Sequence, residues 1–241
     1  MTPWTRTCIS VFGKEFRRMA QSPLLFAFWT VGLFLAGLYF TIGLSLSPEP
    51  NLRIQSLNMC LTLLFVVPLM SMQSFSGEER NGTLEMLLTF PIPLSALIVG
   101  KFLSLFLLTV GLIALSSLNV LVIVVLGTPD WGAVIGGLLA QILASAMYIS
   151  VGLFTSVLTR EPIAAGLGGM VLLLPFWMVD LLVDGVESSM VRTLLTDFSL
   201  VGHLQPMSKG LIDSVDVLWF VMMSIVFLWL TNLVLEAKRW R

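Results

Sequence analysis

The chain's one histidine, His203, closely follows Asp197, and a His–Asp pair is an arrangement that general acid–base catalysis uses. For this pair we favour an ordinary structural hydrogen bond. No second histidine or cysteine lies near enough to suggest a metal site, and no serine lies in a nucleophile-elbow sequence. Residues 99–101 (VGK) resemble the end of a phosphate-binding loop, but Ser95 replaces the glycine required upstream. The sequence therefore predicts a non-enzyme, with no catalytic, metal or cofactor site of its own.

The apolar segments also lack the ionisable residues that ion-coupled carriers place near the bilayer centre, where each costs about 2.5–3.5 kcal/mol. Their polar residues are neutral, and interhelical hydrogen bonds explain them. They are Asn58, Gln73, Asn119, Gln141 and Asn232. Asp180 and Asp184 lie at the end of a span, where an acid can reach water. We therefore expect the energy source in another chain, with an ion-coupled secondary carrier or channel as the alternative.

Composition predicts a membrane protein. The chain is 57% hydrophobic and 11% charged, with a mean hydropathy of +0.97, whereas soluble domains carry roughly 25% charged residues. Its 241 residues are expected to form one transmembrane domain over 1–241. The absence of a long basic block argues against nucleic acid as a partner, and Cys8 and Cys60 are expected to be free thiols.

Six apolar runs are long enough to cross a bilayer, so the predicted fold is all-α and polytopic with six transmembrane helices. The predicted spans are 24–46, 57–75, 96–126, 132–158, 163–179 and 217–235. Lys101, near the start of the third span, is expected to snorkel to the near interface. The fourth span carries small residues at four-residue spacing: Gly132, Gly136, Ala140 and Ala144. Such a stripe permits close helix contact, either within the subunit, which we favour, or across a dimer.

The segments outside the spans are amphipathic. Residues 1–23 predict a helix lying in the membrane interface, with charged residues Lys14, Glu15, Arg17 and Arg18. In 77–93, Asn81 to Thr83 supply a turn and a cap, and Leu84, Leu87 and Leu88 share one helical face, which suggests a docking element. Residues 180–215 mix charged and apolar side chains and predict short interfacial or re-entrant helices.

Charge predicts which side faces the cytoplasm. One group of segments comprises the N-terminal helix, the 77–95 stretch with Lys101, the 159–162 turn and the C-terminus. It carries ten Lys and Arg residues, and the opposite face carries three. Because cytoplasmic loops are enriched in Lys and Arg, both termini and 77–93 are predicted to be cytoplasmic.

Several motifs, in order from end to end, resemble the ABC-2-type permeases, most closely the gliding-motility-type permease subunits of ATP-driven exporters. The first are KEFRRMAQSP at 14–23, ERNGTLEMLLTFP at 79–91 and Gly100-Lys101. The later ones are Asp197-Phe198, His203, GLID at 210–213 and LEAKRW at 235–240. The segment from Glu79 to Glu85 is typical of the broad class, whereas the pattern from His203 to Trp240 indicates the narrower subfamily.

This resemblance implies a type V exporter-like fold in the cytoplasmic (inner) membrane of a prokaryote. It implies a permease that acts as a homodimer, or with a related permease, on two copies of a cytoplasmic ATPase that holds the ATP and magnesium. Residues 77–93 would be the coupling helix, with the ATPase-coupling residues Glu78, Glu79, Arg80, Gly82, Thr83, Leu84, Glu85 and Leu87. Residues 1–23 would be an elbow helix touching the same partner and membrane lipid. Residues 180–215 would form an extracytoplasmic hairpin carrying Asp197, Phe198 and His203, open to an accessory protein.

Two further functions stay open besides ATP-driven export. The chain could be an ion-coupled carrier or channel, or a non-transporting scaffold whose ATPase does mechanical work on extracytoplasmic partners. The spans show neither a charged cavity nor a repeated aromatic surface, so the residues do not identify a substrate.

Overall fold

The computed structural model describes residues 3–46, 52–89, 92–126, 130–183 and 195–240. These residues form helices and their connections, and six helical stretches are long and apolar enough to cross a membrane. They are Pro23–Ser45, Arg53–Arg80, Leu94–Val125, Trp131–Leu158, Pro162–Asp180 and Ser214–Arg239. The predicted all-α fold with six candidate transmembrane helices is therefore confirmed. Much of the predicted 180–215 hairpin, at 184–194, lies outside the described residues.

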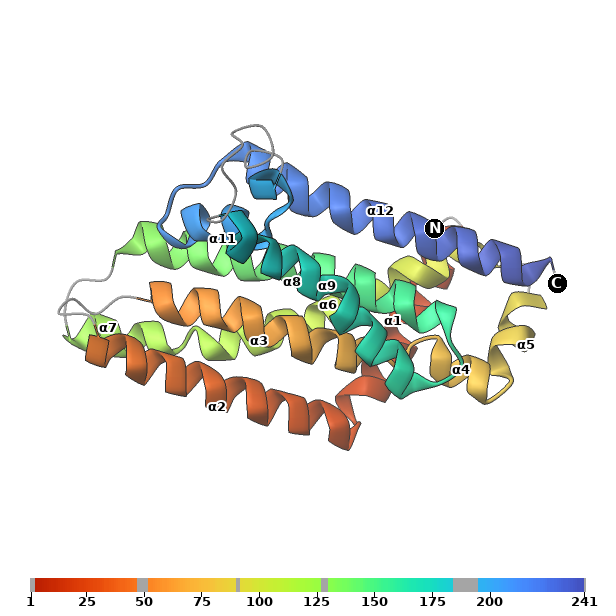
Figure 1. Cartoon of the computed structure of the whole chain (residues 1–241). Helices are drawn as coiled ribbons and strands as arrows, with labels where there is room; N and C mark the ends of the chain where they lie inside the picture. The colour runs from red at the N-terminus through yellow and green to blue at the C-terminus, as the bar shows by residue number, and fades with distance from the viewer. Residues whose placement is uncertain (1–2, 47–51, 90–91, 127–129, 184–194, 241) are drawn as a thin grey trace.

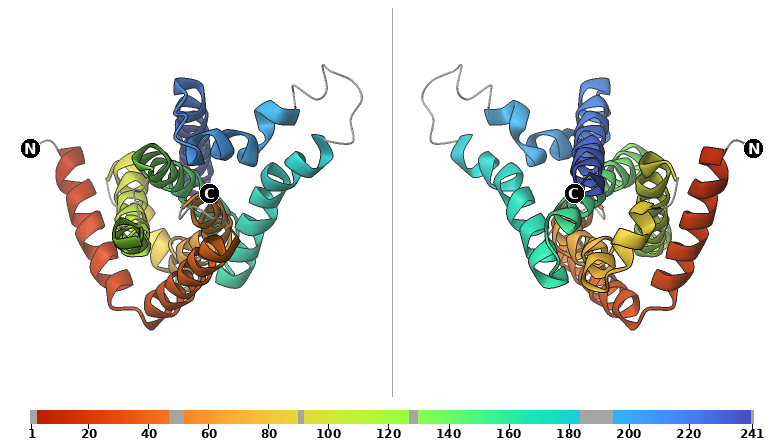
Figure 2. Two further views of the ribbon diagram at one scale, coloured as in Figure 1. Left: turned by 90° about the vertical axis from the view of Figure 1, so that its left-hand side faces the viewer. Right: turned by 90° about the vertical axis from the view of Figure 1, so that its right-hand side faces the viewer.

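The first helices in chain order are α1 (Pro3–Ala20), α2 (Pro23–Leu46), α3 (Arg53–Ser71), α4 (Ser76–Arg80), α5 (Thr83–Thr89) and α6 (Leu94–Ser116). They are followed by α7 (Asn119–Leu126), α8 (Trp131–Leu158), α9 (Pro162–Val183), α11 (Leu200–Ser208) and α12 (Ser214–Arg239). The long helices run side by side, with α4, α5 and the C-terminus at one end of the bundle and α7 and α11 at the other (Figure 1). Seen along the bundle, α1 and α9 extend across the view, whereas α6 and α8 are strongly foreshortened (Figure 2).

Helices α3 and α8 form the centre of the bundle. In each, 67% of the most apolar window is buried, against 17% in α12 and 22% in α2 and α9. Helix α8 packs against α3, α6, α9, α11 and α12, and its side chain Tyr148 is fully buried in the main core together with Met59 and Phe220. The peripheral helices therefore leave most of their apolar surface exposed to whatever surrounds the bundle.

Glycines of α8 allow the close contacts of this core. A Cβ atom on Gly136 would lie 2.1 Å from the carbonyl oxygen of Met207 in α11, and one on Gly152 would lie 1.9 Å from Ser71 Oγ in α3. Gly210, which also contacts the start of α8, has a φ of +86° that favours glycine. At Gly136 the small-residue stripe thus packs within the subunit, as predicted.

The third predicted span, 96–126, consists of two helices, α6 and α7. A turn at Ser117 and Leu118 separates α6 from α7. The Ser117 hydroxyl donates to the Ala114 carbonyl oxygen at 2.7 Å, a side-chain bond that competes with the helical ladder. Gln55 of α3 supports the break, because its amide donates to the Ser116 carbonyl at 3.1 Å and accepts from Asn119 at 3.3 Å. Sequence hydropathy registers no such interruption, since the surrounding residues stay apolar.

We expect Gly136→Ala to destabilise the chain by about 1–3 kcal/mol, because the added methyl group would overpack the contact with the α11 backbone. Chemical unfolding in mixed micelles, followed by tryptophan fluorescence, measures the change. Gly37→Ala in α2 is the matched control, since no atom lies within 4 Å of its added Cβ. Equal stability of the two variants would contradict the packing described for α8 and α11.

Candidate functional site

The turn between α3 and α4 is held by one serine of α8. The backbone N–H groups of Phe75 and Ser76 donate to Ser156 Oγ at 3.0 and 3.1 Å, and this hydroxyl donates to the Met72 carbonyl oxygen at 3.0 Å. The Ser76 hydroxyl donates to the same carbonyl. Ser156 is fully buried and satisfies a carbonyl group at the end of α3 and two N–H groups at the start of α4 that these helix ends would otherwise leave unpaired. No sequence signal indicated it, because it is one neutral polar residue in an apolar span.

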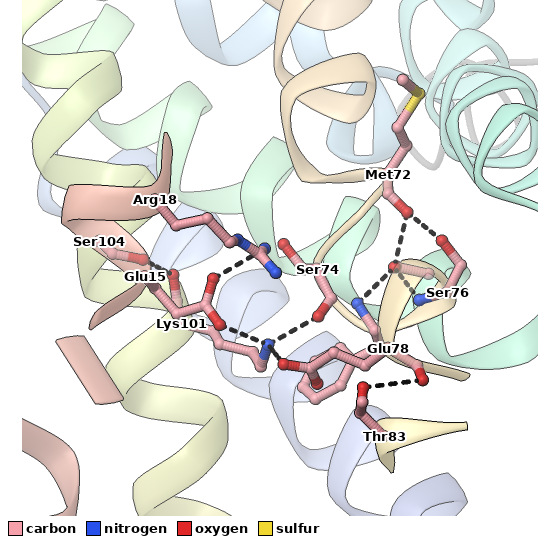
Figure 3. A network of polar contacts seen from close by, with 11 residues as sticks. Glu15, Arg18, Met72, Ser74, Ser76, Glu78, Thr83, Lys101 and Ser104 are labelled. Atoms are coloured by element: carbon pink, nitrogen blue, oxygen red, sulfur yellow. Dashed lines mark hydrogen bonds and ion pairs between the residues drawn. The ribbon is translucent and has the colours of Figure 1, made fainter. Parts of the chain in front are cut away.

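A fully buried lysine lies beside this turn (Figure 3). Lys101 of α6 donates from Nζ to Glu15 Oε1 at 3.0 Å, to Glu78 Oε1 at 2.8 Å and to the Ser74 carbonyl oxygen at 2.6 Å. An ammonium has three N–H donors, so these acceptors match it fully, and the Phe75 ring lies 4.9 Å away. The snorkelling prediction for Lys101 was wrong, because carboxylates from two other helices come to the lysine instead.

The network continues to α1 through Arg18, whose Nη2 lies 2.8 Å from Glu15 Oε2. Glu15 is therefore buried beneath α1, whereas Lys14, Arg17 and Arg18 are exposed. Two cations and two carboxylates balance within the cluster. We refer to Glu15, Glu78 and Lys101, together with the exposed Arg18 that pairs with Glu15, as the buried ion cluster.

Helix α1 approaches α6 closely at Gly100. A Cβ atom there would lie 2.9 Å from Val11 Cγ1 and 3.0 Å from the Cys8 carbonyl oxygen. Cys8 is buried and, like Cys60, is a free cysteine, as predicted. Burial raises the pKa of the Cys8 thiol above its ordinary value, so the thiol stays protonated. A second contact joins the same two helices, because Trp4 of α1 donates from Nε1 to Ser95 Oγ of α6 at 3.0 Å.

The next residue of α4, Glu79, connects to the opposite side of the bundle. It accepts from Arg160 Nε at 3.1 Å, in the turn between α8 and α9, and from Lys238 near the end of α12. Arg80 and Glu161 form a longer pair of 3.7 Å with both side chains exposed, and such surface pairs contribute little. Consecutive acids of α4 thus bind two different groups of helices: Glu78 binds α6 beneath α1, and Glu79 binds the α8–α9 turn and α12.

Helix α5 turns its leucines inward. Gly82 has a φ of +70°, which favours glycine, and Thr83 Oγ1 donates to the Glu78 carbonyl at 3.1 Å. Leu84 and Leu88 are buried in the main core, and Leu87 is partly buried against it. The prediction of a docking face that includes these leucines was wrong for Leu84 and Leu88, because the bundle itself covers them.

The exposed side of α5 carries other residues. Glu85 is exposed, and 66% of Met86 is exposed. A cleft of about 760 Å³ lies next to α5 and is lined on the facing side by Arg160 and the end of α12, Lys238 and Arg239. This end of the molecule therefore offers a recessed surface with charges of both signs, in addition to the protruding Met86.

At the far end of the bundle, His203 binds a different acid from the one predicted. His203 Nδ1 lies 2.6 Å from Asp216 Oδ1 of α12, and Nε2 lies 3.1 Å from the backbone oxygen of Asp197. The ring stacks on Trp219 with centroids 4.7 Å apart. The Asp197 side chain is exposed, as is Phe198. The bond is structural, as favoured, but its carboxylate comes from Asp216 of α12, and Asp197 contributes only its backbone oxygen.

Within the described ranges, no three His, Cys, Asp or Glu side chains come together as a metal site would require. What the arrangement can do is mechanical. The α4–α5 segment, the ends of α8 and α12, and the crossing helix α1 are joined by paired charges at one end of the bundle. A displacement of α4 would act on all of them.

We expect Lys101→Met to destabilise the chain by about 3–5 kcal/mol, because it leaves two buried carboxylates without their cation. The triple variant Glu15→Gln/Glu78→Gln/Lys101→Met should regain most of the loss. Lys14→Met, which removes an exposed cation on α1, should change stability by less than about 0.5 kcal/mol. Unfolding in mixed micelles measures all three. A Lys101→Met variant as stable as Lys14→Met would refute the buried ion cluster.

We expect Ser156→Ala to loosen the start of α4, at a cost of about 1–3 kcal/mol for the backbone groups left unpaired. Hydrogen exchange at the amides of Phe75 and Ser76 should quicken. Ser150→Ala is the control, because the Ser150 hydroxyl donates to Ala146 in its own helix. Unchanged exchange in Ser156→Ala would show that the serine does not hold the turn.

Comparison with known protein families identifies a match over most of the chain. No curated protein matches the chain, but the profile of the family described as "ABC-2 family transporter protein" matches residues 51–235. This range includes α3 to α11 and most of α12, and with them Ser156, Lys101 and the α4–α5 segment. The narrower gliding-motility subfamily is not distinguished by this match. The chain therefore belongs to the ABC-2 family of transporter proteins.

Proposed function

We propose that this chain is the permease subunit of an ATP-driven transporter and that a separate cytoplasmic ATPase docks on the α4–α5 end. The observation that carries the proposal is the placement of α4. Its consecutive residues Glu78 and Glu79 bind buried or partly buried cations on opposite sides of it. A partner that pushes on α4–α5 would therefore act on α6 with α1 and on α12 at once. Rocking of packed helices is a common form of such a transition.

Sidedness supports the same assignment. The basic residues of α1, together with Arg80, Arg160, Lys238 and Arg239, belong to segments at the α4–α5 end of the bundle or tied to it by ion pairs. Because Lys and Arg concentrate on the cytoplasmic side, we infer that this end is cytoplasmic, in the inner membrane of a prokaryote, with both termini on that side. Helix α1 then lies in the cytoplasmic interface.

The exposure of side chains in α4 and α5 supports a choice of the residues that would touch the ATPase. Met86, Glu85, Thr83 and Gly82 are exposed, and so is Arg80. We infer that these form the contact surface. Glu78, Glu79, Leu84 and Leu87 would instead position α4 and α5 from inside. ATP and magnesium would be bound by the partner.

The peripheral helices suggest the assembly. Helices α2, α9 and α12 present mostly exposed apolar surfaces, which lipid or a second permease can cover. We infer a dimer of permeases with two ATPases, as the family resemblance implies, working in export or in mechanical work across the membrane. On the opposite side, Phe198 is 53% exposed beside Asp197 and offers a contact for an extracytoplasmic accessory protein.

Affinity purification of the tagged chain from its native membrane should recover an ABC ATPase, identified by mass spectrometry. We expect Met86→Glu to abolish the recovery, because it puts a charge at an exposed apolar contact while leaving the core intact. Met86→Leu should retain it, since volume and polarity are conserved. Leu84→Glu should instead reduce the yield of folded chain.

Recovery of no ATPase with the unmodified chain would overturn the proposed function. Transport by the purified chain alone under an ion gradient would favour a secondary carrier. Equal recovery of the ATPase with Met86→Glu and Met86→Leu would show that the ATPase binds the chain at a surface other than α5.

A further inference from the structure

A small cavity lies at the corner where α1 turns into α2, against the end of α3. Its volume is about 160 Å³. One part of the lining is polar, with Arg18, Ser22 and Gln73, and the rest is apolar, with residues such as Leu25 and Leu69. A site whose lining is part polar and part apolar suits an amphipathic ligand better than a free ion or a purely apolar molecule.

The polar groups of the cavity retain hydrogen-bonding capacity. Arg18 is bound to Glu15 through Nη2, and its side chain is 42% exposed. A guanidinium has five N–H donors, so this pair leaves others available. In the part of the chain that the structure describes, the side chains of Ser22 and Gln73 form no hydrogen bond. Arginine, amide and hydroxyl donors together match the oxygens of a phosphate group.

Charge around the cavity favours an anion. On α1 the exposed charged residues Arg6, Lys14, Arg17 and Arg18 are all basic. The helix's acid, Glu15, is buried and paired with Lys101 and Arg18. The outward charge of α1 is therefore uniformly positive, and nothing on this helix repels a phosphate that approaches the cavity.

The size and position of the cavity select the ligand. The cavity's volume of about 160 Å³ is below the roughly 300–1,000 Å³ of pockets that enclose a drug-sized ligand, so it can hold part of a headgroup but not a whole lipid. The cavity lies where α2 begins, and its lining includes Leu24 of α2, which is 43% exposed. Acyl chains could continue along this surface of α2.

We propose that this cavity binds the headgroup phosphate of an anionic phospholipid from the adjacent leaflet. Assigning that leaflet to the cytoplasmic side rests on the proposed function, whereas the binding chemistry does not. The phosphate would accept hydrogen bonds from Arg18. Arg18 in turn pairs with Glu15, which pairs with Lys101 in the buried ion cluster. A bound lipid would thus hold the α1–α2 corner against α3. Basic pockets between membrane helices are known to bind such headgroups.

Native mass spectrometry of the purified chain in detergent, titrated with phosphatidylglycerol or phosphatidylcholine, tests the site. We expect one phosphatidylglycerol to bind in preference to phosphatidylcholine. Arg18→Gln should weaken this binding about tenfold, since a charge-assisted hydrogen bond is lost. Arg17→Gln is the matched control, because it removes the same charge from a neighbouring exposed residue that does not line the cavity.

Gln73→Leu provides a second variant, which leaves the Arg18–Glu15 pair intact and should also weaken binding. Equal losses in Arg17→Gln and Arg18→Gln would indicate general surface attraction and overturn the site. Equal binding of the two lipids, or full displacement of phosphatidylglycerol by inorganic phosphate, would also overturn it. The titration uses the chain without its ATPase, so failure here is separate from failure to recover an ATPase.

Discussion

An ammonium group buried inside a protein has to be neutralised where it lies, and this requirement shapes one end of the molecule. Lys101 has no exposed surface, so desolvation of its charge is offset only if carboxylates and a carbonyl surround it. Those groups come from α1 and from the α3–α4 turn with α4, up to 86 residues away in sequence. The crossing position of α1 and the placement of α4 therefore depend on the same cation.

Helix α4 is only five residues long, yet it connects more of the structure than its length suggests. A five-residue helix has little stability of its own, so its position is imposed by Ser156 at its start, by the buried ion cluster on one side and by Lys238 on the other. A displacement of α4 would therefore also displace the helices that hold it, because packed cores shift between discrete arrangements rather than deform continuously. The proposed docking of an ATPase on α4–α5 would use this property.

The rest of the bundle separates a rigid centre from an exposed periphery. Helices α3 and α8 meet through glycine and serine contacts such as Gly152 against Ser71, and close packing of this kind is the main source of helix association where lipid removes the hydrophobic driving force. The outer helices α2, α9 and α12 bury far less of their surface. The centre of the bundle is therefore more closely packed than its periphery.

Composition and periodicity alone determined the class, the six spans and their approximate ends, because mean hydropathy over about 20 residues reports whether a segment can lie in a bilayer. Three features were decided only by the tertiary structure: the burial of Lys101, the inward side of α5 with Leu84, and the choice of Asp216 rather than Asp197 by His203. Helical periodicity shows that residues share a face, but not what that face meets. The pairing of a carboxylate with a cation depends on the distance between helices that folding brings together. A single sequence does not record the distances between such helices.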